Sequence, residues 1–212
     1  MHYNLVLTYS DLGRWEETVA ACKIAARLQP KLPEAYFLLG LSYVNLGDYL
    51  AALEMYQLAI RAKPDYDDAY NNLGNVYIHL KEYGQAAENF TRAIELKPGG
   101  APAHNGLGEA LRNLGRYEEA LNSYRQAVRV DRDYAVAYHN MGLTYIQLKQ
   151  FKEAVESYRQ AVRVNLKDGP ARYNLGVICM SLKDRQAAMN EYEILKTLAP
   201  DLAARLNELL QK

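Results

Sequence analysis

The octapeptide Ser-Tyr-Arg-Gln-Ala-Val-Arg-Val stands at residues 123–130 and returns unchanged at residues 157–164, an offset of 34 residues. The same offset connects three series of single residues along the chain. They are the glycines Gly40, Gly74, Gly108, Gly142 and Gly176, the alanines Ala52, Ala86, Ala120, Ala154 and Ala188, and the aromatic residues Tyr56, Phe90, Tyr124, Tyr158 and Tyr192. A period held this strictly is typical of a protein built from stacked structural repeats.

Residues 33–66 show what one repeat contains. They read PEAYFLLGLSYVNLGDYLAALEMYQLAIRAKPDY, which predicts two antiparallel helices, one over residues 33–46 and one over residues 49–62. Gly47-Asp48 supplies the turn between the helices, and Lys63-Pro64 ends the second helix because proline cannot continue it. One hairpin cannot bury both of its apolar faces, so we expect each repeat to pack on the next.

The recurring residues of this repeat are Tyr36, Leu39, Gly40, Tyr43, Ala52, Tyr56 and Pro64. Their pattern resembles the tetratricopeptide repeat, and the resemblance extends over residues 1–202. It implies an all-α fold, a solenoid of antiparallel helical hairpins that winds into a right-handed superhelix. The repeats would comprise residues 1–32, 33–66, 67–100, 101–134, 135–168 and 169–202, with a capping helix over residues 203–212.

Small residues at fixed places in the repeat predict close helix packing. The eighth-place glycine costs about 1 kcal/mol in helix propensity, and its bare Cα lets the paired helix approach. The 18 tyrosines fall mostly at recurring packing places, so we interpret their excess as structural. Cys22 and Cys179 are far apart within apolar helical patterns, which favours two small core residues over a disulfide or a metal site.

The composition argues against several classes of function. The chain has 25 basic and 25 acidic residues, so no net charge attracts it to nucleic acid or to anionic lipid. No apolar run approaches the roughly 18 residues that cross a bilayer, and the N-terminus shows no signal peptide, which predicts a cytoplasmic location without membrane insertion. The four histidines form no metal-binding pattern. We therefore expect no metal, cofactor or catalytic residue, and a protein that is not an enzyme.

The first repeat departs from the pattern. Val6 replaces the glycine, Thr18 replaces the alanine, and the first helix begins without an N-cap. These features predict an N-terminal edge that is truncated or covered by a partner, and this partner could be a second copy of the chain.

Two later features concern the junctions and the last segment. The fourth and fifth repeats have Arg132 and Leu166 where other repeats have the helix-ending proline. Those junctions could be looser or longer, or they could be ordinary turns without proline. In the last segment, Leu206, Leu209 and Leu210 lie on one side of a predicted helix, which would seal the end of the stack.

In the tetratricopeptide family, a peptide ligand usually lies in a concave groove that is lined by the first helix of each hairpin. The sixth place of the repeat, which would face this groove, holds asparagine in four of the six repeats, at Asn4, Asn72, Asn140 and Asn174, and holds Leu38 and Gly106 in the other two. An amide can pair with both the N–H and the C=O of a peptide backbone, and the series resembles the asparagine ladder in the repeat domain of protein O-GlcNAc transferases. The alternative is that these asparagines cap neighbouring turns or simply match the family consensus.

Other places that would face the groove give an apolar, then polar, then apolar order along the chain. The candidate peptide-binding residues are Asn4, Phe37, Leu41, Val44, Asn72, Asn75, His79, Glu109, Arg112, His139, Asn140, Leu143, Ile146, Tyr173, Asn174 and Val177. A ligand with two hydrophobic anchors around a polar middle would fit this order. The clamp that some co-chaperones use for acidic chain ends is not expected, because no lysine occupies the fifth place.

Four arginines at matching places of consecutive second helices, Arg125, Arg129, Arg159 and Arg163, predict a basic stripe on the outer side. We interpret the stripe as a solvated face, with contact to an acidic partner as the alternative and RNA binding disfavoured by the zero net charge.

The sequence thus predicts a scaffold that binds a peptide segment of a protein partner in its groove, without nucleic acid. Two alternatives stay open at this point. One is a scaffold that assembles with itself through the uncapped N-terminal helix, and the other is an accessory repeat domain of a larger transferase.

Overall fold

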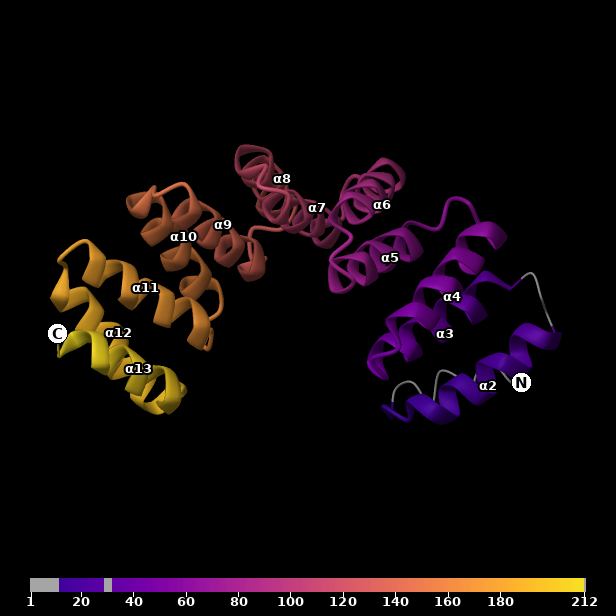
Figure 1. The fold of residues 1–212 in the computed structure, drawn as a ribbon, viewed down its shortest axis with the longest axis horizontal. Coiled ribbons are helices and arrows are strands. Elements are labelled where there is room, and N and C mark those ends of the chain that lie inside the picture. Colours follow the sequence, from indigo (N-terminus) through magenta and orange to yellow (C-terminus); the bar gives the residue numbers. More distant parts are fainter. Residues whose placement is uncertain (1–11, 29–31, 212) are drawn as a thin grey trace. The chain divides into compact units, whose positions relative to one another are not determined.

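The computed structural model of the chain describes residues 12–28 and 32–211, and these residues form twelve α-helices and no β-strand. The all-α fold predicted from the 34-residue period is confirmed (Figure 1). The chain divides into two compact units, residues 1–114 and 115–212, and each is described by itself. The predicted features of Val6 and of the N-terminal edge lie outside the described residues.

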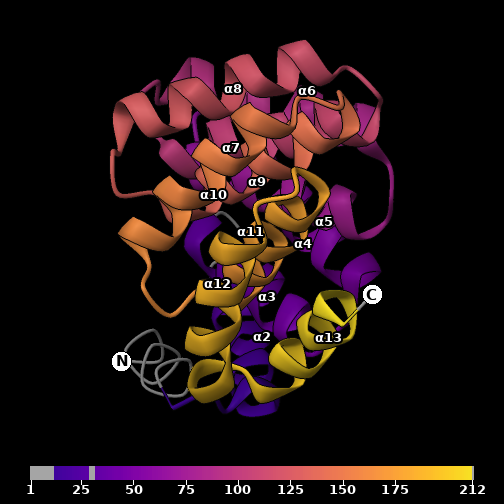
Figure 2. The same cartoon turned by 90° about the vertical axis from the view of Figure 1, so that its left-hand side faces the viewer.

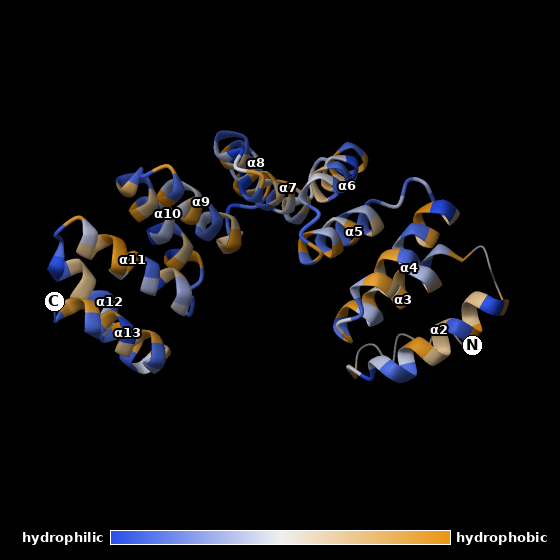
Figure 3. Cartoon of the chain, viewed as in Figure 1, coloured by the Kyte–Doolittle hydropathy of each residue, from blue (hydrophilic) through white to orange (hydrophobic). Residues whose placement is uncertain are grey.

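Helices of 13 and 14 residues alternate through both units, as expected from a hairpin that repeats. The first unit contains α2 (Trp15–Leu28), α3 (Pro33–Asn45), α4 (Tyr49–Ala62), α5 (Asp67–His79), α6 (Tyr83–Leu96) and α7 (Ala101–Asn113). The second unit contains α8 (Tyr117–Val130), α9 (Ala135–Gln147), α10 (Phe151–Val164), α11 (Gly169–Ser181), α12 (Arg185–Leu198) and α13 (Pro200–Leu210). Hydrophobic and hydrophilic residues are interspersed along these helices (Figure 3).

The two helices of a hairpin approach each other at the eighth-place glycine. A Cβ atom built on Gly40 would lie 2.7 Å from the ring of Tyr56, and one on Gly142 would lie 2.7 Å from the ring of Tyr158. Gly74 has the same relation to Phe90, at 2.9 Å. These distances are shorter than any ordinary van der Waals contact. The predicted close approach is confirmed, and the three rings it places are fully buried.

The turn within the hairpin is a Schellman motif in the second, third, fifth and sixth repeats, with one residue in the left-handed conformation. In the second repeat, the N–H of Asp48 donates to the carbonyl of Tyr43, and Gly47 has a φ of 78°. At the same place, Lys81, Lys149 and Lys183 have φ values of 62°, 57° and 63°. The turn geometry is therefore kept even where the residue is lysine, for which this conformation costs about 1–2 kcal/mol.

The junctions that lack proline are neither longer nor shorter than the others. α8 and α10 end at Val130 and Val164, the same place in the repeat at which α4 ends with Ala62. The residue after each of these helices supplies the explanation. Asp131 accepts a hydrogen bond from the N–H of Asp133 (2.9 Å), and Asn165 accepts one from Lys167 (3.1 Å). These side chains fix the turn that a proline would otherwise restrict.

The last helix, α13, packs on both α11 and α12 (Figure 2). It begins at Pro200, three residues before the predicted start, and proline is well suited to the first turn of a helix. Leu206 lies against Gly176 of α11, at the place that an aromatic ring of the second helix takes in earlier repeats. Leu206 and Leu210 are buried, whereas Leu209 is only partly buried. α13 thus closes the second unit with apolar side chains of its own.

Both cysteines are core residues, as predicted. Cys22 is fully buried and Cys179 is 2% exposed. Burial raises the pKa of the Cys22 thiol to about 12 and also raises the pKa of the Cys179 thiol. Both thiols are therefore held in the protonated form within the core.

The glycine–ring contact predicts a large effect of a single methyl group. We expect Gly142→Ala to lower the free energy of unfolding by about 1–3 kcal/mol, because the new Cβ would overlap the Tyr158 ring. Gly84→Ala is the matched control, since Gly84 is helical but has open space around its Cα, and it should stabilise the protein by up to about 1 kcal/mol. Urea titration of both variants measures the difference. Equal effects of the two changes would contradict the packing role.

The lysines in left-handed turns predict the opposite effect of a change to glycine. We expect Lys149→Gly to raise the free energy of unfolding by about 1 kcal/mol, because glycine adopts a positive φ without strain. Gln126→Gly, in the middle of α8, should lower it by about 1 kcal/mol. Thermal unfolding followed by circular dichroism distinguishes these outcomes, and a destabilised Lys149→Gly protein would show that the lysine side chain itself supports the turn.

Candidate peptide-binding surfaces

The described candidate residues all lie on the first helices of the hairpins. In the first unit, α3, α5 and α7 carry Phe37, Leu41, Val44, Asn72, Asn75, His79, Glu109 and Arg112. In the second unit, α9 and α11 carry His139, Asn140, Leu143, Ile146, Tyr173, Asn174 and Val177. Asn4 lies outside the described residues. We call these two sets the first-unit surface and the second-unit surface.

The side-chain amides of the sixth place have partners within the protein. Asn72 donates to the carbonyl of Asp68 (2.8 Å), one turn earlier in α5. Asn174 donates to the hydroxyl of Tyr158 (3.4 Å), which joins α11 to α10. Asn140 is 9% exposed. These contacts support a structural role for part of the asparagine series, the alternative left open by the sequence.

The fourth repeat interrupts the asparagine series for a steric reason. Its sixth place is Gly106, and the ring of Phe90 from the preceding repeat lies directly over this Cα. No side chain fits there without displacing Phe90, which also packs on Gly74. An unbroken row of amides along these helices is therefore excluded by the core.

Three candidate aromatic side chains also have intramolecular partners. The ring of Phe37 lies 5.1 Å from that of Tyr66 and 5.7 Å from that of Tyr56. His79 stacks on Tyr49 of α4, with 4.4 Å between ring centroids. In the second unit, the guanidinium of Arg205 from α13 lies 4.9 Å above the ring of Tyr173. Stacking of this kind stabilises the helix contacts and limits the faces that a ligand could use.

The aliphatic candidates are neither buried nor fully exposed. Leu143 and Ile146 of α9 and Val177 of α11 are partly buried and pack against the core of the second unit. Leu41 and Val44 of α3 have the same character in the first unit. Part of each side chain therefore keeps contact with solvent and would gain from being covered.

The polar candidates of the first unit lie on α5 and α7. Asn75 is exposed, and Glu109 and Arg112 are partly buried one turn apart. The Nε atom of Arg112 is buried and has no hydrogen-bond partner among the residues that the structure describes. A buried donor without a partner is costly, so this atom lowers the stability of the local packing.

His139 belongs to a small polar cluster at the start of α11. Its Nδ1 lies 3.7 Å from Oδ2 of Asp168, and its ring meets that of Tyr158 edge to face at 5.5 Å. Asp168 also caps α11 by accepting a hydrogen bond from the N–H of Ala171 (2.9 Å). The His139 ring, the N–H of Ala171 and the nearby Arg172 lower the pKa of the Asp168 carboxyl below its ordinary value.

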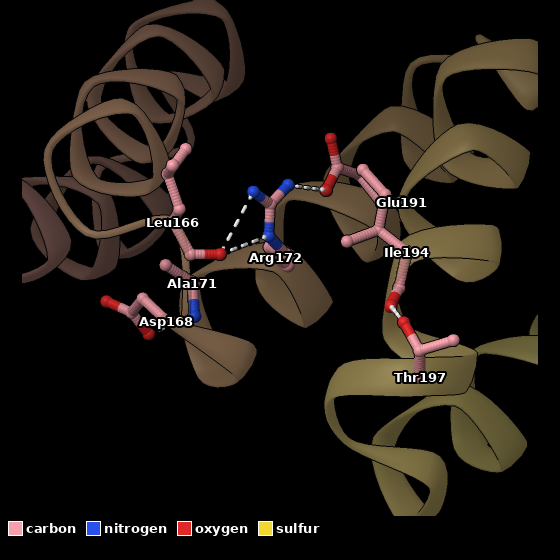
Figure 4. A network of polar contacts seen from close by, with 7 residues as sticks. All are labelled: Leu166, Asp168, Ala171, Arg172, Glu191, Ile194 and Thr197. Carbon is pink, nitrogen blue, oxygen red and sulfur yellow. Dashed lines mark hydrogen bonds and ion pairs between the residues drawn. The ribbon is translucent and has the colours of Figure 1, made fainter.

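A buried ion pair in the last repeat was not found by sequence reasoning. Arg172 of α11 is 8% exposed, donates twice to the carbonyl of Leu166 (3.2 Å) and pairs with Glu191 of α12 (3.0 Å; Figure 4). In the fourth repeat, His104 makes the equivalent contact to the carbonyl of Pro98 (2.9 Å). The signal in the sequence was an arginine at the fourth place, where other repeats have tyrosine or histidine. A single unusual residue does not reveal its partner before the helices are packed.

Two further observations concern other classes of site. Within residues 12–28 and 32–211, no three His, Cys, Asp or Glu side chains gather as a metal site would require. Of the helices described, none has both the length and the apolar character that crossing a membrane demands.

Comparison with protein-family models identifies the class of protein. Models described as tetratricopeptide or TPR repeat match residues 3–67, 37–101, 89–122, 108–149, 135–168 and 169–202. Together these matches extend from residue 3 to residue 202, the range in which the 34-residue period holds. The chain belongs to the tetratricopeptide repeat family. A comparison with curated protein sequences gave no significant match.

Several solved structures share the fold. Pseudomonas aeruginosa PilF is 18% identical, with a TM-score of 0.81 over 94% of this chain and 90% of that one. The Thermus thermophilus TPR protein TTC0263 is 26% identical, with a TM-score of 0.67 over 85% of this chain and 100% of that one. YrrB, described as a TPR protein with an unusual peptide-binding site, is 21% identical, with a TM-score of 0.66 over 89% and 98%.

The His139–Asp168 contact predicts a pH dependence of stability. Because the folded protein lowers the pKa of Asp168 below 3.8, the unfolded chain takes up a proton more readily, so stability falls as the pH decreases below about 5. We expect Asp168→Asn, which keeps the cap, to lower the melting temperature at pH 7 and to flatten its fall between about pH 5 and pH 3. Asp184→Asn is the matched control, because Asp184 caps α12 in the same way without a histidine partner. The same flattening in both variants would contradict a specific role of His139.

Proposed function

We propose that the chain is a scaffold that binds a peptide segment of a protein partner on the first-helix surfaces. Tetratricopeptide proteins are generally protein-interaction scaffolds, and the similar YrrB is described as having a peptide-binding site. The proposal includes no catalytic step, in keeping with a fold that generally serves as a non-catalytic scaffold. It includes no cofactor.

The observation that carries the proposal is the half-buried row of aliphatic side chains on α9 and α11. Leu143 and Ile146 follow one another at the spacing of a helix turn, and Val177 occupies the place in the next repeat that Leu143 has in its own. All three remain partly exposed although they pack on the core. Covering the remaining apolar area stabilises a complex by about 25 cal/mol for each Å² removed from water.

The amides beside this row would orient the ligand. The NH₂ group of Asn174 is engaged by Tyr158, so its side-chain oxygen is the atom that would accept a hydrogen bond from a peptide N–H. A net contribution of about 1 kcal/mol for one such bond is modest. We therefore expect apolar anchors to supply most of the affinity and the amides to set the direction of the peptide.

The test begins with peptides selected from a random display library against the whole chain. We expect Ile146→Ser combined with Val177→Ser to weaken the selected peptides at least about tenfold, since two apolar anchors contribute roughly 1.4 kcal/mol or more together. The matched control is Val130→Ser combined with Ile194→Ser, which makes the same chemical change on the second helices α8 and α12. Fluorescence anisotropy gives the affinities, and circular dichroism verifies the fold of each variant. An equal loss of affinity in both double variants, or a loss only in the control variant, would refute the proposed surface.

The two alternatives from the sequence stay hypotheses. Self-assembly was suggested by residues that lie outside the described part of the chain, and light scattering over a hundredfold range of concentration would detect it as a rising mass. The accessory domain of a larger transferase rests on the asparagine series, part of which has partners inside the protein. A cytoplasmic location and the absence of nucleic-acid binding likewise stay predictions.

A further inference from the structure

A cavity lies between the second helices α10 and α12 of the second unit, away from the candidate peptide-binding residues. Its volume is about 320 Å³, and α11 contributes to its lining. Three arginines line it, Arg159 and Arg163 from α10 and Arg172 from α11, together with one carboxylate, Glu191 of α12. The remaining lining is largely aliphatic and includes Val162, Leu175 and Ala187.

The three arginines differ in how they are held. Arg172 is fixed by the carbonyl of Leu166 and by Glu191, so its guanidinium is a rigid, buried part of the cavity (Figure 4). Arg159 and Arg163 form no hydrogen bond or ion pair within the described part of the chain. Positive charge therefore exceeds negative charge here.

One repeat earlier, the equivalent arginine is hydrogen-bonded within the protein, and two carboxylates line the hollow beside it. Arg125, which corresponds to Arg159, donates to Asn122 (3.0 Å) and to the hydroxyl of Tyr145 (3.0 Å). The hollow beside it is lined by the carboxylates Glu118 and Glu153. In the later repeat, Cys179 takes the place of Tyr145 and Ala187 takes the place of Glu153. The unpaired basic cavity is thus specific to the last two repeats and does not follow from the period itself.

We propose that this cavity binds a carboxylate of an acidic peptide segment in a protein partner, with an aliphatic residue of the same segment on the apolar wall. Guanidinium groups bind carboxylates through strong charge-assisted hydrogen bonds. The wall of Val162, Leu175 and Ala187 provides a place for the neighbouring aliphatic side chain. Single-stranded RNA is a poorer match, because its bases usually stack on aromatic side chains and the cavity lining contains none. This second site is independent of the first-helix surfaces.

The test uses a fluorescein-labelled peptide, Gly-Ser-Glu-Leu-Glu-Leu-Gly-Ser, and the whole chain in about 50 mM salt, where charge interactions are weakly screened. We expect Arg159→Gln combined with Arg163→Gln to weaken binding about tenfold or more. Arg125→Gln combined with Arg129→Gln, at the same places one repeat earlier, should change it less than about twofold. All four side chains are exposed, and circular dichroism verifies the fold of both variants, because Arg125 also donates to Tyr145.

Two companion probes complete the experiment. A peptide with glutamine in place of both glutamates should bind at least about tenfold more weakly than the acidic peptide. A labelled oligouridine RNA should bind no better than that glutamine peptide. The proposal is overturned by equal loss in both arginine pairs, by tight binding of the glutamine peptide, by RNA that binds more tightly than the acidic peptide, or by no binding of the acidic peptide at millimolar concentration.

Discussion

The distance between the two helices of a hairpin depends on one contact, in which an aromatic ring of the second helix rests on the bare Cα of a glycine in the first. Gly40, Gly74 and Gly142 receive Tyr56, Phe90 and Tyr158 in this way. The alanine one turn before each ring is also fully buried, which lets the helices stay close. Since consecutive repeats pack through the same helices, an error in this distance would be passed on to the neighbouring repeat. The requirement for a small residue opposite each ring explains why glycine and alanine recur every 34 residues.

The polar contacts at the junctions between repeats depend on how the apolar helix faces pack. Once the helices are placed, the carbonyl groups at the end of each repeat need partners. Arg172 and His104 supply them from the fourth place of the following repeat, at Leu166 and Pro98. Asp131 and Asn165 fix the turns that have no proline. Different side chains thus achieve one geometry, because the hydrogen-bonding requirement of the backbone is the same in every repeat.

The surfaces that could bind a partner consist of side chains that helix packing leaves exposed or without an intramolecular partner. Part of the asparagine series is engaged by Asp68 and Tyr158, and Gly106 interrupts it because Phe90 needs the space. The aliphatic residues of α9 and α11 pack against the core on one side only, so they stay partly exposed. On the other side of α11, a cavity keeps two unpaired arginines. An apolar surface and a basic cavity on one unit would allow a partner to be recognised through two different chemistries.

The sequence alone determined the helical hairpins, their bounds to within a residue in the second repeat, and the close approach at the glycines, because these depend on local spacing that recurs every 34 residues. It also determined that Cys22 and Cys179 are core residues, since both lie within apolar helical patterns. Only the tertiary structure decided which groove candidates already have partners, as Asn174 does in Tyr158 and Tyr173 does in Arg205. It also decided that Arg172 is a buried ion-pair partner and that Arg159 and Arg163 face a cavity. These features join residues from different helices, and the distances between them are set by packing rather than by spacing along the chain.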